Sequence, residues 1–252
     1  MVQKIHLISF GNREFNKSLD RLANEATKFG VFDSIKIYRP DNISLEFANK
    51  YGNILTEDFG AGYWIWKFNI IQQRLNDINN NDILIYLDAG CSINYNGKDR
   101  FYEYIELLNN SDKGIISFKL PDACKEYIWT IEEIFKELNI NSEDKIYNSS
   151  QYLGGILIMK KCDNLQLILD KSLELIDKDT LMITNHYVKR NKDKHSFFRD
   201  NRHDQSILSV IRKLYGSAVI LDDETIYIEN DHIIWDNDII MKYPFWATRI
   251  KN

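Results

Sequence analysis

The sequence predicts an α/β fold in which helices cover both faces of a mixed, mostly parallel, Rossmann-like sheet. Its first forty residues follow the order strand, helix, strand, which is the opening of a βαβ unit. Ile5 to Phe10 is mostly apolar, Phe15 to Phe29 repeats apolar residues at helical spacing, and Ser34 to Tyr38 follows the helix-ending Gly30. Further along, Ile83 to Leu87 is an unbroken apolar run, which is typical of a strand buried on both faces of a sheet.

The remaining elements are expected from the same patterns. Gly154 and Gly155 interrupt an otherwise apolar strand, which indicates a bulge or a close approach of backbones. The length of 252 residues and the 44% hydrophobic content fit one α/β domain of the larger sort. Helices are expected at about 64–75, 100–108, 131–138, 164–176 and after 203, and strands at about 114–118, 153–159, 218–221, 226–228 and 233–235.

Composition excludes several classes of protein. The formal net charge of −5 argues against general nucleic-acid binding. The three cysteines have no pair spacing, which fits a reducing compartment and no zinc site. No apolar run approaches the roughly 20 residues of a membrane span, and residues 1–10 lack the features of a signal peptide. We therefore expect a cytoplasmic protein, peripheral at the inner membrane surface if its acceptor is lipid-linked.

Asp88 stands at the point where the buried strand 83–87 ends. In open α/β sheets, ligands bind outside the carboxyl ends of the strands, so Asp88 is a charge at the rim of the core. The small residues Ala89 and Gly90 leave space there for a ligand or a metal ion. The alternative is that Asp88 only caps a turn, because Asp-x-Gly turns are common.

The stretch from Gly60 to Lys67 combines glycines, aromatic residues and a lysine at the expected start of a helix. Lys67 would lie in the first helical turn, where the helix dipole favours an anion such as a diphosphate. Trp64 would lie beside it, and Arg74 is a second candidate for a phosphate contact. The alternative is that the tryptophan packs in the core and that Lys67 is solvated.

The first strand-to-helix turn is a further candidate for the nucleotide site. In a doubly wound sheet this turn meets the nucleotide, and here it contains Ser9, Phe10 and Asn12. An ordinary turn explains the same residues equally well. No Gly-x-Gly-x-x-Gly follows the strand, so a dinucleotide cofactor is not expected.

Three segments carry a recognisable pattern: Gly62-Tyr63-Trp64-Ile65-Trp66-Lys67, then Asp82-Ile83-Leu84-Ile85-Tyr86-Leu87-Asp88-Ala89-Gly90-Cys91, and later His203-Asp204-Gln205-Ser206. The pattern resembles GYWxWKP, DILLYxDAGC and HDQS in small GT-A glycosyltransferases of bacteria and large viruses. The resemblance runs from the first strand to Arg249. It implies a GT-A fold with a nucleotide-binding half at about 1–118 and an acceptor-binding half at about 119–252. Phe68 departs from it by replacing a proline, and Gly90 by replacing the second aspartate of an Asp-x-Asp signature.

The resemblance also implies partners and an activity. The donor would be a nucleotide sugar, with UDP as the expected nucleotide. The acceptor would be a glycan or a lipid-linked glycan in the synthesis of surface polysaccharide, lipopolysaccharide or glycoprotein glycans. A divalent cation, Mn²⁺ or Mg²⁺, would neutralise the departing diphosphate, because these hard ions favour carboxylate and phosphate oxygens.

Individual residues receive roles from the resemblance. Asp88 would hold the cation, with help from His203. The candidates for the catalytic base, or for orienting the acceptor hydroxyl, are Asp204, Glu126 and Asp122, although each also fits a capping or surface role. The candidate donor-binding residues are Ser9, Phe10, Asn12, Trp64, Lys67, Arg74, Asp88, Ala89, Gly90, Gln151, Gly154, Gly155 and Arg249.

Residues 185–202 form a basic, loop-like stretch in an otherwise acidic chain. We expect either a mobile lid over the diphosphate, a dock for an anionic acceptor or membrane, or a solvated loop. Two other classes of function stay open for the whole chain. One is a non-catalytic module that binds nucleotide sugars or glycans, which the glycine at position 90 favours, and the other is a nucleotidyltransferase.

Overall fold

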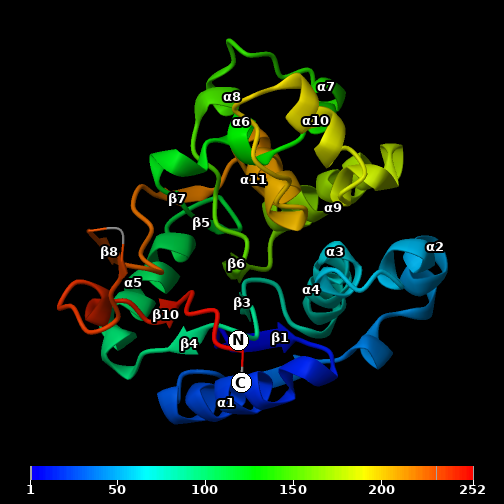
Figure 1. Cartoon of the computed structure of the whole chain (residues 1–252). Coiled ribbons are helices and arrows are strands. Elements are labelled where there is room, and N and C mark those ends of the chain that lie inside the picture. The colour runs from blue at the N-terminus through cyan, green and yellow to red at the C-terminus, as the bar shows by residue number, and fades with distance from the viewer. Residues whose placement is uncertain (1, 231, 252) are drawn as a thin grey trace.

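A computed structural model describes residues 2–230 and 232–251. Its centre is a four-stranded sheet in the order β2-β1-β3-β6, in which β1 pairs in parallel with β2 and β3, and β6 runs antiparallel to β3 (Figure 1). The predicted α/β class with a mostly parallel sheet is confirmed. The strands are β1 (Ile5–Phe10), β2 (Ser34–Tyr38), β3 (Ile83–Leu87), β4 (Ser92–Ile93), β5 (Ile116–Phe118), β6 (Ile156–Lys160), β7 (Ala218–Ile220), β8 (Ile228–Glu229), β9 (His232–Ile233) and β10 (Phe245–Trp246).

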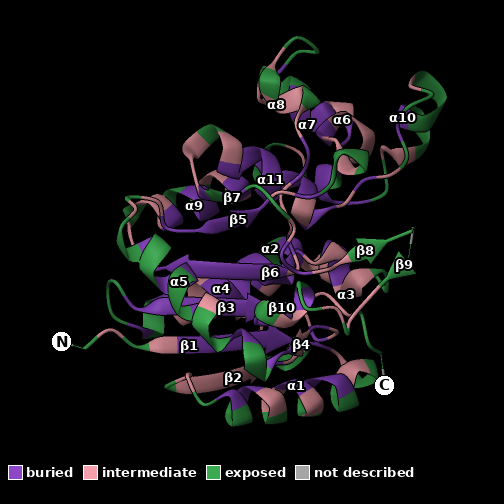
Figure 2. Cartoon of the chain, turned by 90° about the vertical axis from the view of Figure 1, so that its left-hand side faces the viewer, coloured by how far each residue is buried: buried purple, intermediate pink, exposed green. Residues whose placement is uncertain are grey.

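The sheet is buried on both faces because alternate residues of its inner strands enter two separate cores. In β3, Leu84 and Tyr86 face one core, whereas Ile83, Ile85 and Leu87 face the other. Figure 2 shows these inner strands as buried, between layers whose outer surfaces are exposed. The continuous apolar run in the sequence is the direct consequence of this double burial.

The helices divide between the two faces. Helices α1 and α5 contribute to the core on one face, and α2, α4, α9 and α11 contribute to the core on the other. Among the described residues, no helix combines the length and the apolar character needed to cross a bilayer. The helices are α1 (Asn16–Phe29), α2 (Leu45–Leu55), α3 (Gly60–Tyr63), α4 (Trp66–Asp77), α5 (Lys98–Asn109), α6 (Glu126–Trp129), α7 (Glu132–Glu137), α8 (Lys145–Asn148), α9 (Asp163–Lys178), α10 (Val188–Lys194) and α11 (Asp204–Tyr215).

An upper lobe stands beyond β6 and is built mainly from residues that follow β5 (Figure 1). Its small parallel sheet joins β5 to β7, and the short helices α6, α7, α8 and α10 lie above it in Figure 2. Strand β6 lies beyond residue 118 in the sequence, yet it completes the central sheet through its pairing with β3. The two halves of the chain therefore share one sheet.

Two expected elements begin later than the sequence indicated. The strand expected from 153 begins at Ile156, so Gly154 and Gly155 precede β6 and do not interrupt it. The helix expected from Trp64 begins at Trp66, because residues 60–64 all have positive φ angles.

The stretch 185–202, expected as a mobile loop, contains α10 and is anchored by backbone hydrogen bonds from Arg199 to Ile128 and from Arg202 to Trp129.

Arg212 of α11 ties this helix to β5 and to the segment that precedes β6. It is fully buried, and its guanidinium donates to the carbonyls of Tyr152 at 3.1 Å and Leu153 at 2.8 Å and to the hydroxyl of Ser117 at 3.2 Å. Burial lowers the pKa of Arg212 to about 10, so it stays charged at neutral pH.

Replacing Arg212 with methionine should lower the free energy of unfolding by about 2–4 kcal/mol, because several buried acceptors lose their donor. Urea unfolding measures this change. Lys192→Met, at an exposed position of α10, is the control and should change stability by less than about 0.5 kcal/mol. A loss of under about 1 kcal/mol for Arg212→Met would show that these acceptors find other partners.

Candidate active site

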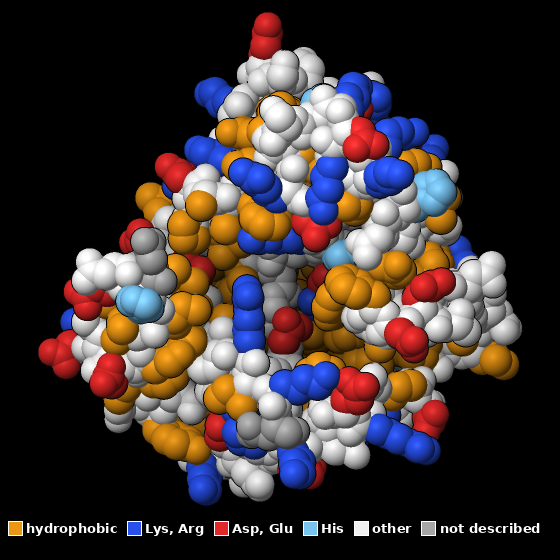
Figure 3. All heavy atoms as spheres, viewed as in Figure 1, with side chains coloured by type: hydrophobic (Ala, Val, Ile, Leu, Met, Phe, Trp, Pro, Cys, Tyr) orange, Lys and Arg blue, Asp and Glu red, His pale blue; other side chains and the backbone are white. Residues whose placement is uncertain are grey.

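The site lies where the strand order reverses. The chain passes from β1 to β2 on one side and later returns to place β3 on the other side of β1. The crevice outside the carboxyl ends of β1 and β3 is therefore a topological switch point, where open α/β sheets bind ligands. Phe10 ends β1, and Asp88 follows the end of β3. Figure 3 shows a hollow on this face, below the upper lobe, with acidic and basic side chains inside it.

Asp88 presents a carboxylate to this hollow. Its side chain is 41% exposed, whereas Lys67 and Asp204 behind it are 2% and 7% exposed. One oxygen of Asp88 accepts from the hydroxyl of Tyr86 and lies 3.6 Å from the ammonium of Lys67. Burial and the nearby negative charge of Asp88 raise the pKa of Tyr86, so its hydroxyl remains a donor.

Lys67 is the centre of the buried charges. Its ammonium pairs with the carboxylate of Asp204, donates to the carbonyl of Gly154 at 3.0 Å and lies 4.9 Å from the ring centre of Tyr86. Burial opposes the charge of Lys67, but attraction to Asp204 and Asp88 outweighs it and raises the pKa. Burial raises the pKa of Asp204 to about 6, against the attraction of Lys67. Both groups are charged at pH 7, and acidification below pH 6 protonates Asp204.

This geometry changes the expected role of two residues. Lys67 is neither solvated nor free for a diphosphate, because it is covered and already paired. Asp204 opens α11 but is not a side-chain cap, because His203 occupies the N-cap position and Asp204 binds Lys67 instead. The pair joins the starts of α4 and α11 beneath Asp88.

The two glycines before β6 make this packing possible. A Cβ atom on Gly155 would stand 2.6 Å from an oxygen of Asp88, and one on Gly154 would stand 2.9 Å from the Cβ atom of Gln205. The carbonyl of Gly155 also accepts the backbone N–H of Asp88 at 2.9 Å. Gly155 thus provides space for the exposed carboxylate, and Gly154 provides space for the start of α11.

An aromatic wall borders the hollow beside α3. It consists of Phe59, Tyr63 and Trp64 around His203, with ring centres 5.3–5.4 Å from that of the histidine. Figure 3 shows hydrophobic side chains at this edge. Burial lowers the pKa of His203 to about 4, so the ring is neutral at pH 7. Phe59 is half exposed and offers a stacking surface to a sugar or a base.

Several predicted residues do not reach the hollow. Arg74 donates to Ser34 and contacts His6, which lie at the amino ends of β2 and β1, at the opposite edge of the sheet. Ser9 is buried and donates its hydroxyl to the carbonyl of Leu87.

Other predicted residues hold the fold together. Glu126 is fully buried and bonds to Ser209 and Lys213. Gln151 is also fully buried, with its amide donating toward Trp129, Thr130 and Ser206. Phe10 stacks on Trp66 at 3.8 Å, and Asn12 caps a short 3₁₀ turn. Asp122 differs from these because it is 76% exposed on the upper lobe.

The residues present do not form a protein-built site for Mn²⁺ or Mg²⁺. Residues 2–230 and 232–251 contain no group of three or more His, Cys, Asp or Glu side chains placed to hold a metal ion. Asp88 offers one open carboxylate, but Asp204 is paired with Lys67. His203 donates from Nε2 to the Asn185 side-chain oxygen at 2.8 Å, so this nitrogen is not free to bind a metal.

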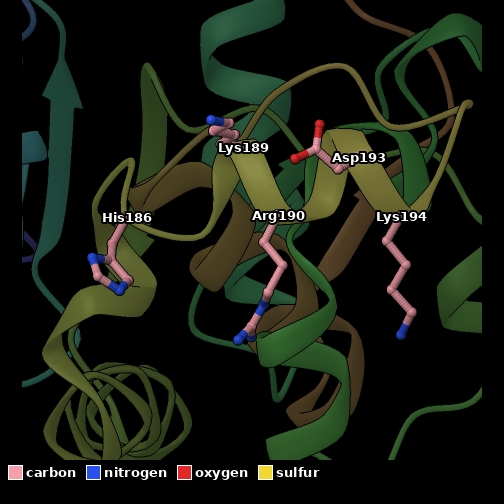
Figure 4. Close-up of a pocket in the computed structure, with 5 residues that line it drawn as sticks. All are labelled: His186, Lys189, Arg190, Asp193 and Lys194. Carbon is pink, nitrogen blue, oxygen red and sulfur yellow. The ribbon is translucent and has the colours of Figure 1, made fainter.

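A second concave surface lies away from the switch point, along α10 (Figure 4). It has a volume of about 590 Å³ and is lined by His186, Lys189, Arg190, Asp193 and Lys194. Arg190 pairs with Glu133, and Lys194 lies 2.7 Å from Glu132. This surface is wide and open, and its paired cations join α10 to α7, so we do not regard it as the site of chemistry.

No protein-family model and no curated protein match this chain. Solved structures do match it. A glycosyltransferase involved in the glycosylation of the major capsid of PBCV-1 superimposes with a TM-score of 0.50 at 14% identity, over 96% of this chain and 92% of that chain. Mouse xyloside xylosyltransferase 1 gives 0.46 at 11% identity, over 88% and 86%. The galactosyltransferase LgtC, in complex with donor and acceptor sugar analogs, gives 0.42 at 11%, over 86% and 72%.

The similarity to the viral glycosyltransferase extends over nearly the whole of both chains. The chain therefore has a GT-A fold, as the sequence predicted.

Replacing Lys67 with methionine should lower the free energy of unfolding by about 3–5 kcal/mol, because Asp204 would keep a buried charge without a partner. The double variant Lys67→Met/Asp204→Leu should recover most of this loss. Urea unfolding of the single and double variants measures the coupling. Lys50→Met, which breaks the exposed pair with Asp177, is the control and should cost less than about 1 kcal/mol. Additive effects of Lys67→Met and Asp204→Leu would contradict the pairing.

Replacing Gly155 with alanine should destabilise the fold by about 1–3 kcal/mol, because the new methyl group overlaps the Asp88 carboxylate. Adding Asp88→Ala should relieve the overlap and restore most of the stability. Gly154→Ala is the matched control, since its methyl group would meet Gln205 and should gain nothing from Asp88→Ala. Equal rescue of both alanine variants would mean that Asp88 does not occupy the space beside Gly155.

Proposed function

We propose that this chain is a glycosyltransferase that moves a sugar from a nucleotide donor, UDP-linked, to a hydroxyl group of a glycan acceptor. The observation that carries the proposal is Asp88, an exposed carboxylate at the switch point of the sheet, backed by the buried pair of Lys67 and Asp204. The GT-A fold supports the same reaction class. An exposed charge held over a buried ion pair at the switch point is typical of a ligand site.

The donor would enter the crevice between the ends of β1 and β3. The turn after Phe10 and the loop from Asp88 to Gly90 border this crevice from neighbouring strands. The aromatic wall of Phe59, Tyr63, Trp64 and His203 stands at its edge and suits the apolar face of a sugar ring.

In the reaction, the bond between the anomeric carbon and the diphosphate oxygen breaks, and its electron pair stays on the leaving diphosphate. The acceptor oxygen forms the new bond to the anomeric carbon and gives up its proton. Asp88 would accept hydrogen bonds from donor hydroxyls and stabilise the positive charge that develops on the sugar. Lys67 would hold the Asp88 carboxylate in place, because its ammonium lies 3.6 Å from one of the carboxylate oxygens.

The acceptor would approach from the upper lobe. Asp122 is the exposed acid there and stays a candidate base, whereas Glu126 is buried in an ion pair with Lys213. Lys189, Lys192 and Arg199 are exposed basic residues of the stretch 185–202. They suit an anionic or lipid-linked acceptor of surface polysaccharide, lipopolysaccharide or glycoprotein glycan synthesis, met at a membrane surface.

The expected Mn²⁺ or Mg²⁺ would have Asp88 as its one open protein carboxylate. The glycine at position 90 also favours a second candidate function, a module on the same fold that binds nucleotide sugars without catalysis.

Replacing Asp88 with asparagine should lower sugar transfer by at least about 100-fold, because the substitution removes the negative charge beside the anomeric carbon. UDP release from a panel of UDP-sugars, measured with and without Mn²⁺, reports the reaction even when water is the acceptor. Asp41→Asn, at an exposed aspartate, is the control and should keep the full rate.

The other outcomes separate the alternatives. UDP binding by the wild type without any UDP release, including with mixed glycan acceptors, would favour the non-catalytic module. Release of pyrophosphate from UTP and a sugar phosphate would indicate a nucleotidyltransferase. Absence of UDP binding under all conditions would end the proposal.

A further inference from the structure

A side chain at position 90 of the loop after Asp88 would be crowded by the C-terminal segment. A Cβ atom on Gly90 would stand 3.1 Å from the Cα atom of Arg249, 3.3 Å from its carbonyl carbon and 3.4 Å from the nitrogen of Ile250. These neighbours are backbone atoms and cannot rotate away as a side chain can. An aspartate at position 90 would therefore require the backbone of the C-terminal segment to shift slightly.

That segment is firmly attached. The carbonyl of Gly90 accepts from the N–H of Ile250 at 3.0 Å and from the hydroxyl of Thr248 at 2.7 Å. The Thr248 hydroxyl also bonds to the hydroxyl of Ser92 at 2.9 Å, and β10 pairs with β4 just before it. The fold thus places the backbone of Arg249 beside the position where an Asp-x-Asp loop would carry its second acid.

Arg249 is available to a ligand. It is exposed, and no hydrogen bond or ion pair holds its guanidinium within residues 2–230 and 232–251. Its backbone is left-handed at φ +54°, a conformation that is unfavourable for a residue with a side chain. Burial raises the pKa of Asp223, and hydrogen bonds with Thr225 and then the charge of Arg249 partly oppose this rise.

Two other cations near the loop are occupied. Lys67 serves two carboxylates, Asp204 and Asp88. Arg21 donates to the carbonyl of Ala89 at 3.3 Å and pairs with Glu25 at 3.0 Å. An incoming diphosphate brings further negative charge that neither can balance. Figure 3 shows basic side chains beside the acidic one in the hollow, near the place where the C-terminal segment in Figure 1 crosses the end of β3.

We infer that Arg249 takes the place of a divalent cation as the counter-charge for the donor diphosphate, so that this site binds a nucleoside diphosphate without metal. The inference rests on the proposed function. A guanidinium suits this role because it is always charged and presents a planar fork of donors to phosphate oxygens. As the glycosidic bond breaks, the electron pair left on the diphosphate oxygen is stabilised by the Arg249 charge.

Calorimetry of the full chain with UDP tests the inference, first in EDTA and then with Mn²⁺. The wild type should bind UDP in EDTA with an affinity that Mn²⁺ changes by less than about threefold. Arg249→Ala should weaken UDP binding at least about tenfold, and Arg249→Lys by less, since it keeps the charge and loses the fork. Lys251→Ala, at an exposed lysine that pairs with Glu14, is the matched control and should bind UDP like the wild type.

Uridine distinguishes a diphosphate contact from a general loss of the site, because it should bind Arg249→Ala and the wild type equally. Circular dichroism of Arg249→Ala should match the wild type, as the residue is exposed. UDP binding that appears only with Mn²⁺ would overturn the inference and leave the proposed function intact. Unchanged UDP affinity of Arg249→Ala in EDTA would also overturn it. Absence of UDP binding in both conditions would remove the proposed function as well.

Discussion

The Lys67 ammonium, enclosed between Asp204 and Asp88, is the interaction on which the site depends. It joins the first turn of α4, the first turn of α11 and the end of β3, and through the carbonyl of Gly154 it also reaches the loop before β6. A lysine with 2% exposure is tolerated only when its charge is compensated, because taking an ion out of water costs several kcal/mol. The pair therefore fixes where these segments meet, and Asp88 is the part of the cluster left open to solvent.

The backbone before α4 is constrained as well, by a run of residues in left-handed conformations. Residues 60–64 form a turn with positive φ throughout, which three non-glycine residues adopt, and His203 across from them also has φ +51°. Each such residue costs about 1–2 kcal/mol. The aromatic contacts between this turn and His203 help to offset that cost. The turn directs α4 inward, which is why Lys67 enters the core while Phe59 remains half exposed.

The sequence predicted the elements of the central sheet well, because apolar runs and helical spacing report burial directly. It also located Asp88, since the end of a doubly buried strand is visible as the end of an apolar run. It could not predict which charges are paired. The place of Lys67 in the first turn of a helix predicts a contact with the donor phosphate. Whether a lysine faces solvent, however, depends on its tertiary partner. The partner of Lys67 is Asp204, which is 137 positions away in the sequence. Arg74 lies in the same helix and was therefore a candidate for a phosphate contact. Its partner His6 instead holds it at the opposite end of the strands.

The sequence does not reveal that the C-terminal segment lies against the loop after Asp88. A contact between two backbone segments that are distant in the sequence places it there. A glycine at position 90 indicates a missing acid when the loop is considered alone. In the fold it is the point where residues 248–250 cross the loop, and a side chain there would press against their backbone. The same contact that favours glycine at position 90 brings the backbone of Arg249 next to the loop. A loop that keeps only Asp88 beside a paired lysine has little net negative charge to attract a cation. The same loop, with an arginine at its edge, is already suited to an anion.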